Sequence, residues 1–152
     1  MIAKPYLIFL GDAENATFAK TGLGVRAWAP DDCLGQWRLT GSTVDLGLPD
    51  MRPAEAFAAG ARSLLIGVAS IGGQMPLAWT PLLVEALEAG LDIVSGMHTR
   101  LASVPDIAKV AALLGRALHD VRQTDRPLSV ATGQKRTGKR LLTVGTDCAL
   151  GK

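Results

Sequence analysis

The sequence predicts an α/β domain with a Rossmann-like, mostly parallel sheet of about five strands and helices on both faces. Short apolar runs alternate with segments whose apolar residues recur at helical spacing, a rhythm typical of parallel strands joined by crossover helices. The length of 152 residues and a hydrophobic content of 48% suffice for one packed core. Residues 63–69 (SLLIGVA) form a continuous apolar run bounded by turn formers, which indicates a strand buried on both faces at the sheet's centre.

Five short segments are strand candidates: four are apolar runs bounded by glycine or polar turn residues, and the fifth, HDVR, is a candidate for the last strand of the set. They are residues 6–11 (YLIFLG), 33–39 (CLGQWRL), 63–69, 91–96 (LDIVSG) and 119–122 (HDVR). Residues 41–50 are rich in turn formers and are predicted to be a loop, either irregular throughout or with one short extended segment around Val44.

Four segments between these runs are predicted to be helices: residues 14–29, 53–61, 77–90 and 103–118. Gly22 and Gly24 weaken the expectation for the second half of the first helix. Pro53 and Pro105 suit first helical turns, where a missing N–H costs nothing. Ser103 is the expected N-cap of the last helix.

The amino-acid composition of the chain changes after residue 125. Residues 126–139 combine basic residues and glycines with few large apolar groups, as an interdomain linker does. Residues 140–152 then open with a short apolar strand, LLTV. We therefore predict an N-terminal domain over 1–125, a linker over 126–139 and the start of a second domain over 140–152.

The last eight residues, GTDCALGK, follow a strand and resemble the G-x-x-x-x-G-K pattern of a P-loop, with five residues instead of four between Gly145 and Gly151. In such a loop, backbone N–H groups surround a phosphate and the lysine adds a positive charge. The expected phosphate-binding residues are Gly145, Thr146, Asp147, Cys148, Gly151 and Lys152. The alternative is a glycine-flanked turn. Because a P-loop strand needs partner strands that follow it in the chain, we expect the sequence to be the N-terminal fragment of a longer protein.

Charge and cysteine content exclude several functional classes. The formal net charge of +2 lacks the excess of positive charge that marks nucleic-acid binders. The N-terminus has no signal-peptide pattern, and no apolar run approaches the roughly 20 residues that cross a bilayer. Cys33 and Cys148 are far apart and outside any CxxC spacing, which predicts free thiols and no metal site. We expect a cytoplasmic protein with no nucleic-acid or membrane partner.

Several motifs occur in a fixed order along the chain. They are GDA at 11–13, LGLPDM at 46–51, GVASIGG at 67–73, SGMHTRL at 95–101 and the terminal GTDCALGK. With these motifs the sequence resembles the DgcN-type D-glutamate N-acetyltransferases, formerly a family of unknown function. The resemblance implies a Rossmann-like domain followed by a P-loop domain akin to dethiobiotin synthetase. It also implies acetyl transfer from acetyl-CoA to the amino group of D-glutamate, in D-amino-acid catabolism.

Acetyl transfer to an amine needs a site for the CoA phosphates, a base for the ammonium proton and donors for the thioester oxyanion. The terminal P-loop is the candidate for the phosphates, of either CoA or a nucleoside triphosphate. His98 follows a predicted strand, and its ordinary pKa of about 6.5 suits a catalytic base. A backbone-capping role is the alternative. Arg100 is the candidate for a substrate carboxylate, with a surface salt bridge as the alternative.

Glycines after the predicted central strand are further candidates. Gly72 and Gly73 leave backbone N–H groups unshielded for a substrate anion, although a tight turn with positive φ explains them equally well. Asp12 is expected to cap the following helix rather than to act as a base. His119 is assigned a structural role. A small side chain tolerated in the loop explains Cys148 better than a nucleophile does.

The fragment alone is expected to be inactive, and two alternative functions remain open. One is a substrate-recognition or oligomerisation module whose chemistry lies in the second domain. The other is part of an ATP-dependent ligase or kinase, which would use ATP and Mg²⁺. Trp28, Trp37 and Trp79 are scattered along the sequence and are interpreted as packing or interface residues, in keeping with a homo-oligomer.

Overall fold

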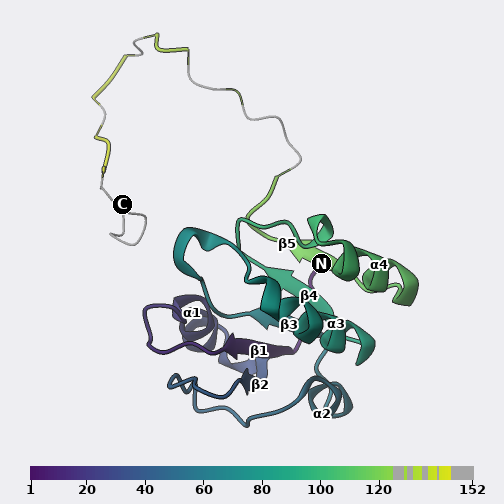
Figure 1. Cartoon of the computed structure of the whole chain (residues 1–152). Coiled ribbons are helices and arrows are strands. Elements are labelled where there is room, and N and C mark those ends of the chain that lie inside the picture. The colour runs from purple at the N-terminus through teal and green to yellow at the C-terminus, as the bar shows by residue number, and fades with distance from the viewer. Residues whose placement is uncertain (125–128, 130–131, 135–136, 140, 145–152) are drawn as a thin grey trace.

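A computed structural model describes residues 1–124, 129, 132–134, 137–139 and 141–144 of the chain. Five strands form one sheet in the order β2-β1-β3-β4-β5, and every pair is parallel (Figure 1). The strands are β1 (Tyr6–Gly11), β2 (Cys33–Arg38), β3 (Ser63–Ile66), β4 (Asp92–Ser95) and β5 (Leu118–Asp120). The predicted five-stranded parallel sheet is confirmed, with the apolar run at Ser63 as its central strand.

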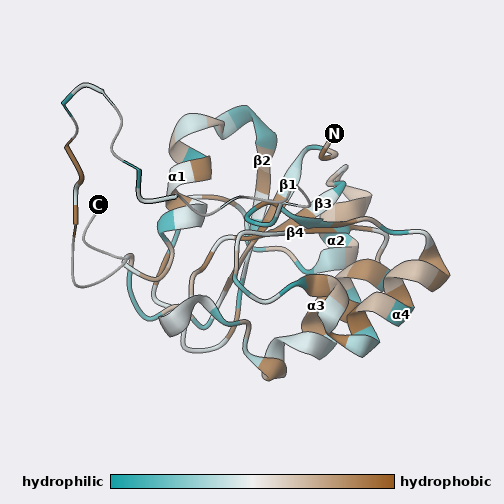
Figure 2. Cartoon of the chain, turned by 90° about the horizontal axis from the view of Figure 1, so that it is seen from above, coloured by the Kyte–Doolittle hydropathy of each residue, from teal (hydrophilic) through white to brown (hydrophobic). Residues whose placement is uncertain are grey.

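Helices cover both faces of the sheet, as predicted. They are α1 (Lys20–Trp28), α2 (Pro53–Ala58), α3 (Thr80–Glu88) and α4 (Pro105–Leu114). α1 lies on one face, and the other three lie on the opposite face (Figure 2). Right-handed crossovers explain this division, because the chain moves from β1 to β2 in one direction and then back across β1 in the other. The reversal occurs between β1 and β3.

The core lies on both sides of β1 and β3, whose residues are all buried. Phe9 of β1 contacts Trp37 of β2 and Trp79 before α3 edge to face, with ring centroids 5.1 and 5.2 Å apart. Such pairs add to the burial of apolar area. The packing role predicted for Trp37 and Trp79 is thus confirmed. Trp28 differs, because its residue is 91% exposed.

Two glycines let α1 approach the sheet closely. The backbone N–H of Gly22 donates to the carbonyl oxygen of Gly67 at 2.7 Å. A Cβ at Gly67 would lie 2.6 Å from Ile8 Cγ2 and 3.1 Å from Gly22 Cα. α1 is therefore held directly against the carboxyl end of β3.

The first helix is shorter than predicted. It begins at Lys20, not at residue 14. The side chain of Asn15 accepts from the backbone N–H of Thr17 at 3.0 Å, and its carbonyl oxygen accepts from Phe18 at 3.2 Å. These contacts satisfy the backbone as a turn instead of a helix. The second half of the predicted helix, where Gly22 and Gly24 had weakened the expectation, is the part that is helical. Gly22 is needed there because it packs against Gly67.

Other predicted boundaries also need correction. Ser103 does not cap α4; its hydroxyl donates to the carbonyl oxygen of Arg100 at 2.7 Å, and the N-cap is Val104. α4 ends at Leu114, because Gly115 adopts a left-handed conformation with φ of 63°. The loop after β2 has no strand at Val44; its one extended pairing joins Asp50 to Gln36. Pro53 and Pro105 occupy first helical turns, as predicted.

Candidate functional site

The carboxyl ends of the five parallel strands meet at one edge of the sheet. In open α/β sheets, ligands bind outside this edge, at the point where the strand order reverses. Here the reversal lies between β1 and β3, and a cavity of about 220 Å³ opens there. We call it the switch-point cavity. Its walls include Phe18, Val68 and Trp79, and polar groups are supplied by Asp12 and Ser70.

The turn after β3 forms one side of this cavity and continues toward β4. Gly73 N–H donates to the carbonyl oxygen of Ser70 at 2.9 Å, and the Ser70 hydroxyl donates to the carbonyl oxygen of Gln74. Gly72 and Gly73 have φ of 75° and 70°, values that only glycine adopts readily. The turn itself therefore requires both glycines. An anion contact at either one stays a prediction.

His98 lies directly against this turn. Its backbone N–H donates to the carbonyl oxygen of Gly73 at 2.8 Å. A Cβ at Gly73 would lie 2.9 Å from Cδ2 and 3.0 Å from Nε2 of the His98 ring. The structure thus brings together three residues singled out from the sequence: Gly72, Gly73 and His98. The imidazole is exposed, so a ligand can reach it.

A side-chain network joins the loops after β3 and β4. The Thr99 hydroxyl donates to Gln74 Oε1 at 2.8 Å and accepts from the backbone N–H of Met75 at 3.0 Å. The carboxylate of Asp120 accepts from the backbone N–H of Leu101. Arg100 lies in the same loop, is exposed and already makes an interaction of its own. The loop that carries His98 is therefore held by hydrogen bonds to the loop after β3 and to Asp120 of β5.

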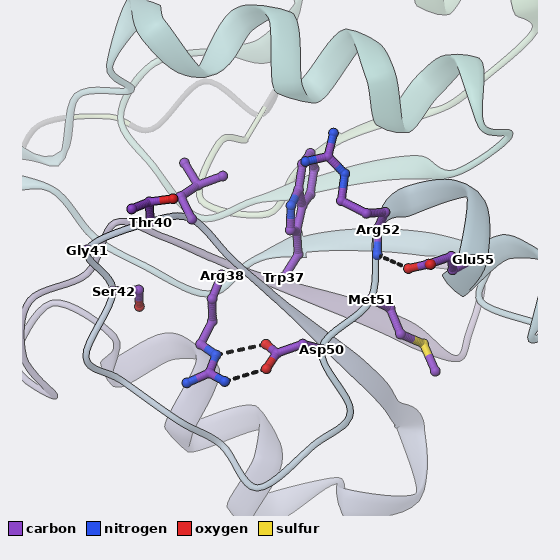
Figure 3. A pocket seen from close by; sticks show the side chains of 10 residues that line it. Trp37, Arg38, Thr40, Gly41, Ser42, Asp50, Met51, Arg52 and Glu55 are labelled. Carbon is purple, nitrogen blue, oxygen red and sulfur yellow. Dashed lines mark hydrogen bonds and ion pairs between the residues drawn. The ribbon is translucent and has the colours of Figure 1, made fainter.

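A larger hollow of about 510 Å³ opens at the end of β2 (Figure 3). We call it the β2-end cavity. It is lined by two segments, Trp37–Ser42 and Asp50–Glu55. Sequence reasoning missed this cavity, because it interpreted Trp37 as a packing or interface residue. The one available signal was the position of Trp37 next to the carboxyl end of a strand.

Gln36 shapes the loop beside the β2-end cavity. Its buried amide donates from Nε2 to Asp45 Oδ1 at 2.9 Å and accepts at Oε1 from the backbone N–H of Leu46 at 2.8 Å. Its backbone N–H donates to Pro49, and its carbonyl oxygen accepts from Met51, each at 2.9 Å. These four hydrogen bonds of Gln36 hold the loop over residues 45–51 against β2.

Ion pairs line the same cavity. Arg38 Nε donates to Asp50 Oδ1 at 2.7 Å, while Nη2 binds Oδ2 and Nη1 lies 3.6 Å from Asp45 Oδ2. The hydrogen bond from Arg38 lowers the pKa of Asp50, and the hydrogen bond from the Gln36 amide lowers the pKa of Asp45. Both aspartates are therefore ionised at neutral pH.

Arg52 forms the other charged wall. Its Nη2 donates to both carboxylate oxygens of Glu85 at 2.8 Å. Its guanidinium carbon lies 5.2 Å from the centroid of the Trp37 ring. Its backbone N–H donates to Glu55 Oε2 at 2.7 Å, which caps α2. Arg52 thus links α2, α3 and the aromatic end of β2.

The other predicted site residues fall elsewhere. The P-loop candidates Gly145, Thr146, Asp147, Cys148, Gly151 and Lys152 lie outside the described residues. Cys33 is a buried free thiol, as predicted, and burial raises its pKa. Within the described part of the chain, no group of three His, Cys, Asp or Glu side chains could hold a metal ion. None of the helices described there is long and apolar enough to cross a membrane.

Comparison with known proteins adds independent information. The family described as DUF1611_N, a Rossmann-like domain of unknown function, matches residues 37–124. A protein of Tritonibacter scottomollicae named D-glutamate N-acetyltransferase is 51% identical over 152 residues, which cover all of this chain and 46% of the relative. A protein of the same name from a Pseudoalteromonas species is 37% identical over 151 residues, 99% of this chain and 46% of the relative.

A solved structure shares the fold. The crystal structure of a DUF1611 family protein from Anabaena variabilis superposes with a TM-score of 0.68 and is 28% identical in sequence. The superposition covers 86% of this chain and 40% of that protein. The chain therefore spans less than half the length of the relatives it matches.

Proposed function

This chain belongs to the DUF1611_N family of Rossmann-like domains, and on that premise we propose that it supplies the N-terminal domain of a D-glutamate N-acetyltransferase. The observation that carries the proposal is the 51% identity, along the whole chain, to a relative named for this activity. In this proposal residues 1–125 form the domain, 126–139 a linker and 140–152 the start of a P-loop domain. This part alone would be inactive, and the whole enzyme a cytoplasmic homo-oligomer.

The proposed reaction transfers an acetyl group from sulfur to nitrogen. His98 takes a proton from the ammonium group of D-glutamate, and the freed amine attacks the thioester carbonyl carbon of acetyl-CoA. A C–N bond forms, the C–S bond breaks, and CoA leaves as the thiolate, which takes the second proton that the nitrogen loses as it becomes an amide. The supporting geometry is an exposed imidazole at the carboxyl edge of the sheet, with its ring against Gly73. A general base of this kind contributes about 10²–10⁴-fold in rate.

We propose different roles for Gly72 and Gly73. Gly73 N–H is already used within the turn, where it donates to Ser70. Gly73 therefore contributes by the side chain it lacks, which leaves room for the His98 ring. Gly72 N–H is the better candidate donor to a substrate anion, because a Cβ built there would meet no atom within 4 Å.

The remaining contacts are proposed from chemistry. Arg100, two residues after His98, would bind a carboxylate of D-glutamate through its guanidinium. Gly145, Thr146, Asp147, Cys148, Gly151 and Lys152 would bind the phosphates of acetyl-CoA. The switch-point cavity adjoins the same turn at Ser70 and offers apolar walls for the methylene groups of the substrate.

Product analysis tests this proposal. The protein encoded by the reading frame that contains this chain is incubated with D-glutamate and acetyl-CoA, and products are identified by mass spectrometry. We expect N-acetylglutamate, and His98→Asn should lower kcat by about 10²-fold or more. His119→Asn is the matched control and should leave kcat nearly unchanged. A phosphorylated or ADP-forming reaction with ATP, without acetylated product, would contradict the proposal.

A further inference from the structure

The β2-end cavity contains a polar group that the described protein does not satisfy. Trp37 is 2% exposed, yet its indole Nε1–H has no hydrogen-bond partner within the described residues. Buried donors in native proteins are nearly always paired, so each exception calls for an explanation such as a missing ligand. The ring lines the cavity at the end of β2, where ligands of open α/β sheets bind.

Other unused polar atoms surround the same space. Figure 3 shows Thr40 on one side of the Trp37 ring and the Arg52 guanidinium on the other. Among the described residues, Arg52 donates from Nη2 and its backbone N–H, which leaves Nε and Nη1 open to solvent, and the Thr40 side chain is exposed as well. Glu55 accepts a hydrogen bond at Oε2 and keeps Oε1 open. The cavity thus offers donors around the indole and a carboxylate oxygen at its rim.

The charges argue against an anionic ligand. Two guanidinium groups, of Arg38 and Arg52, are already held by carboxylates. Four carboxylates belong to the cavity and its ion pairs: Asp45, Asp50, Glu55 and Glu85. Acidic groups therefore outnumber basic groups, and a phosphate or a carboxylate would be repelled. A neutral ligand with one acceptor for the indole is the better match.

The size and position of the β2-end cavity indicate which kind of neutral ligand it binds. The volume of about 510 Å³ lies within the range of about 300–1,000 Å³ that holds drug-sized ligands. A nucleoside has ring-nitrogen acceptors on its base and hydroxyl donors on its ribose. In dinucleotide-binding folds, an acidic side chain accepts hydrogen bonds from the ribose hydroxyls. Glu55 offers such a carboxylate here.

We propose that the β2-end cavity binds a neutral purine nucleoside moiety, with a ring nitrogen of the base accepting from Trp37 Nε1–H and the ribose hydroxyls donating to Glu55. Arg52 covers the indole, and its exposed ion pair with Glu85 is weak enough to let the guanidinium move and stack on the base. This inference goes beyond the proposed function, because the adenosine of acetyl-CoA carries phosphate on its ribose and would be repelled by the same carboxylates.

Indole resonances test the contact directly. The chain has three tryptophans, so ¹⁵N-labelled protein gives three indole N–H signals, which single substitutions assign. We expect adenosine to shift the Trp37 signal saturably and to leave that of the exposed Trp28 in place. No shift of Trp37 at millimolar adenosine would overturn the proposal. A shift of Trp37 with D-glutamate instead of adenosine would also overturn it.

A substitution gives a second readout. Trp37→Phe keeps an aromatic ring against Phe9 and removes the N–H, and it should weaken adenosine binding about tenfold. Trp28→Phe is the matched control and should bind adenosine normally. Unchanged affinity of the Trp37→Phe protein would overturn the proposal. If that variant does not fold, the indole shift of the unsubstituted chain decides alone.

The same measurements separate this inference from the proposed function. If the enzyme transfers acetyl but adenosine does not shift the Trp37 signal, the nucleoside site is contradicted and the proposed function is not. A Trp37 response to adenosine in a protein that makes no N-acetylglutamate would overturn the function and leave the nucleoside site standing.

Discussion

Gly22 and Gly67 are in direct backbone contact: the N–H of Gly22 donates to the carbonyl oxygen of Gly67 at 2.7 Å. This contact joins α1 to the end of the central strand. It lies beside the point where the strand order reverses, because Gly67 follows β3 and its N–H donates to Phe9 of β1 at 2.8 Å. The close packing of α1 on the end of β3 therefore depends on two residues without side chains.

Gly67→Ala should destabilise the domain by about 2–3 kcal/mol, because the added methyl group overpacks a filled space. Its Cβ would lie 2.6 Å from Ile8 Cγ2 and 3.2 Å from the carbonyl oxygen of Phe9. Urea denaturation followed by circular dichroism measures the free energy of unfolding.

Gly24→Ala is the matched control within α1. A Cβ there meets no atom within 4 Å, so the change should stabilise the helix by about 0.5–1 kcal/mol. Equal effects of the two substitutions would contradict the close packing described for Gly67.

Gln36→Leu should destabilise the domain by about 2 kcal/mol, because it removes two hydrogen bonds and leaves the Leu46 N–H without its acceptor. The loop beside the β2-end cavity should also exchange its amide hydrogens faster. Hydrogen exchange at Leu46 and urea denaturation measure the two effects. Gln134→Leu, at an exposed position, should change stability by less than about 0.5 kcal/mol. Unaltered exchange at Leu46 in Gln36→Leu would contradict the role given to the amide.

The pair of Arg38 and Asp50 predicts a small acid-dependent loss of stability. The hydrogen bond from Arg38 lowers the folded-state pKa of Asp50, so its contribution is present above the unfolded value of about 3.9 and is lost as pH falls through the folded pKa. The contribution is small, because the Asp50 side chain is half exposed and screened.

Asp50→Asn tests this pH dependence. The stability difference between the two proteins should be larger at about pH 6 than at about pH 2.5, and 1 M salt should reduce it. Urea denaturation at both pH values provides the numbers. A difference that is the same at both would show that the ion pair makes no titrating contribution.

Cys33 should react slowly with thiol reagents in the folded chain. Its thiol is buried, donates to the carbonyl oxygen of Ala29 at 3.3 Å and has a pKa raised by desolvation. Since only the thiolate is reactive, labelling at about pH 8 should be far slower than in urea. A Cys148→Ser protein isolates the Cys33 signal. Equal labelling rates in the folded and unfolded protein would contradict the burial of this thiol.

Much of the fold was predictable from the sequence, because its signals are local. The continuous apolar run at Ser63–Ile66 indicated a central strand, and Pro53 and Pro105 located the starts of two helices. The first helix was wrong at its start, because Asn15 forms a turn with its own side chain. The spacing of apolar residues does not show whether a side chain such as that of Asn15 will form a turn in place of the helix.

The candidate site was predictable only in part. The rule that ligands bind at strand ends located His98 and Gly73, which the structure places in contact. The β2-end cavity depends on long-range contacts, above all on Gln36 drawing the loop at Asp45 and Leu46 back to β2. No local sequence pattern predicts that this loop folds back onto β2. The P-loop prediction concerns residues outside those described.

We propose that this domain binds the D-glutamate to be acetylated at the carboxyl edge of its sheet. Isothermal titration calorimetry of the chain with D-glutamate tests it most directly, with L-glutamate and an Arg100→Ala protein as controls. We expect saturable binding of D-glutamate, millimolar or tighter, that exceeds binding of L-glutamate and weakens in Arg100→Ala. Absence of saturable heat with D-glutamate, in a chain that folds cooperatively, would contradict it.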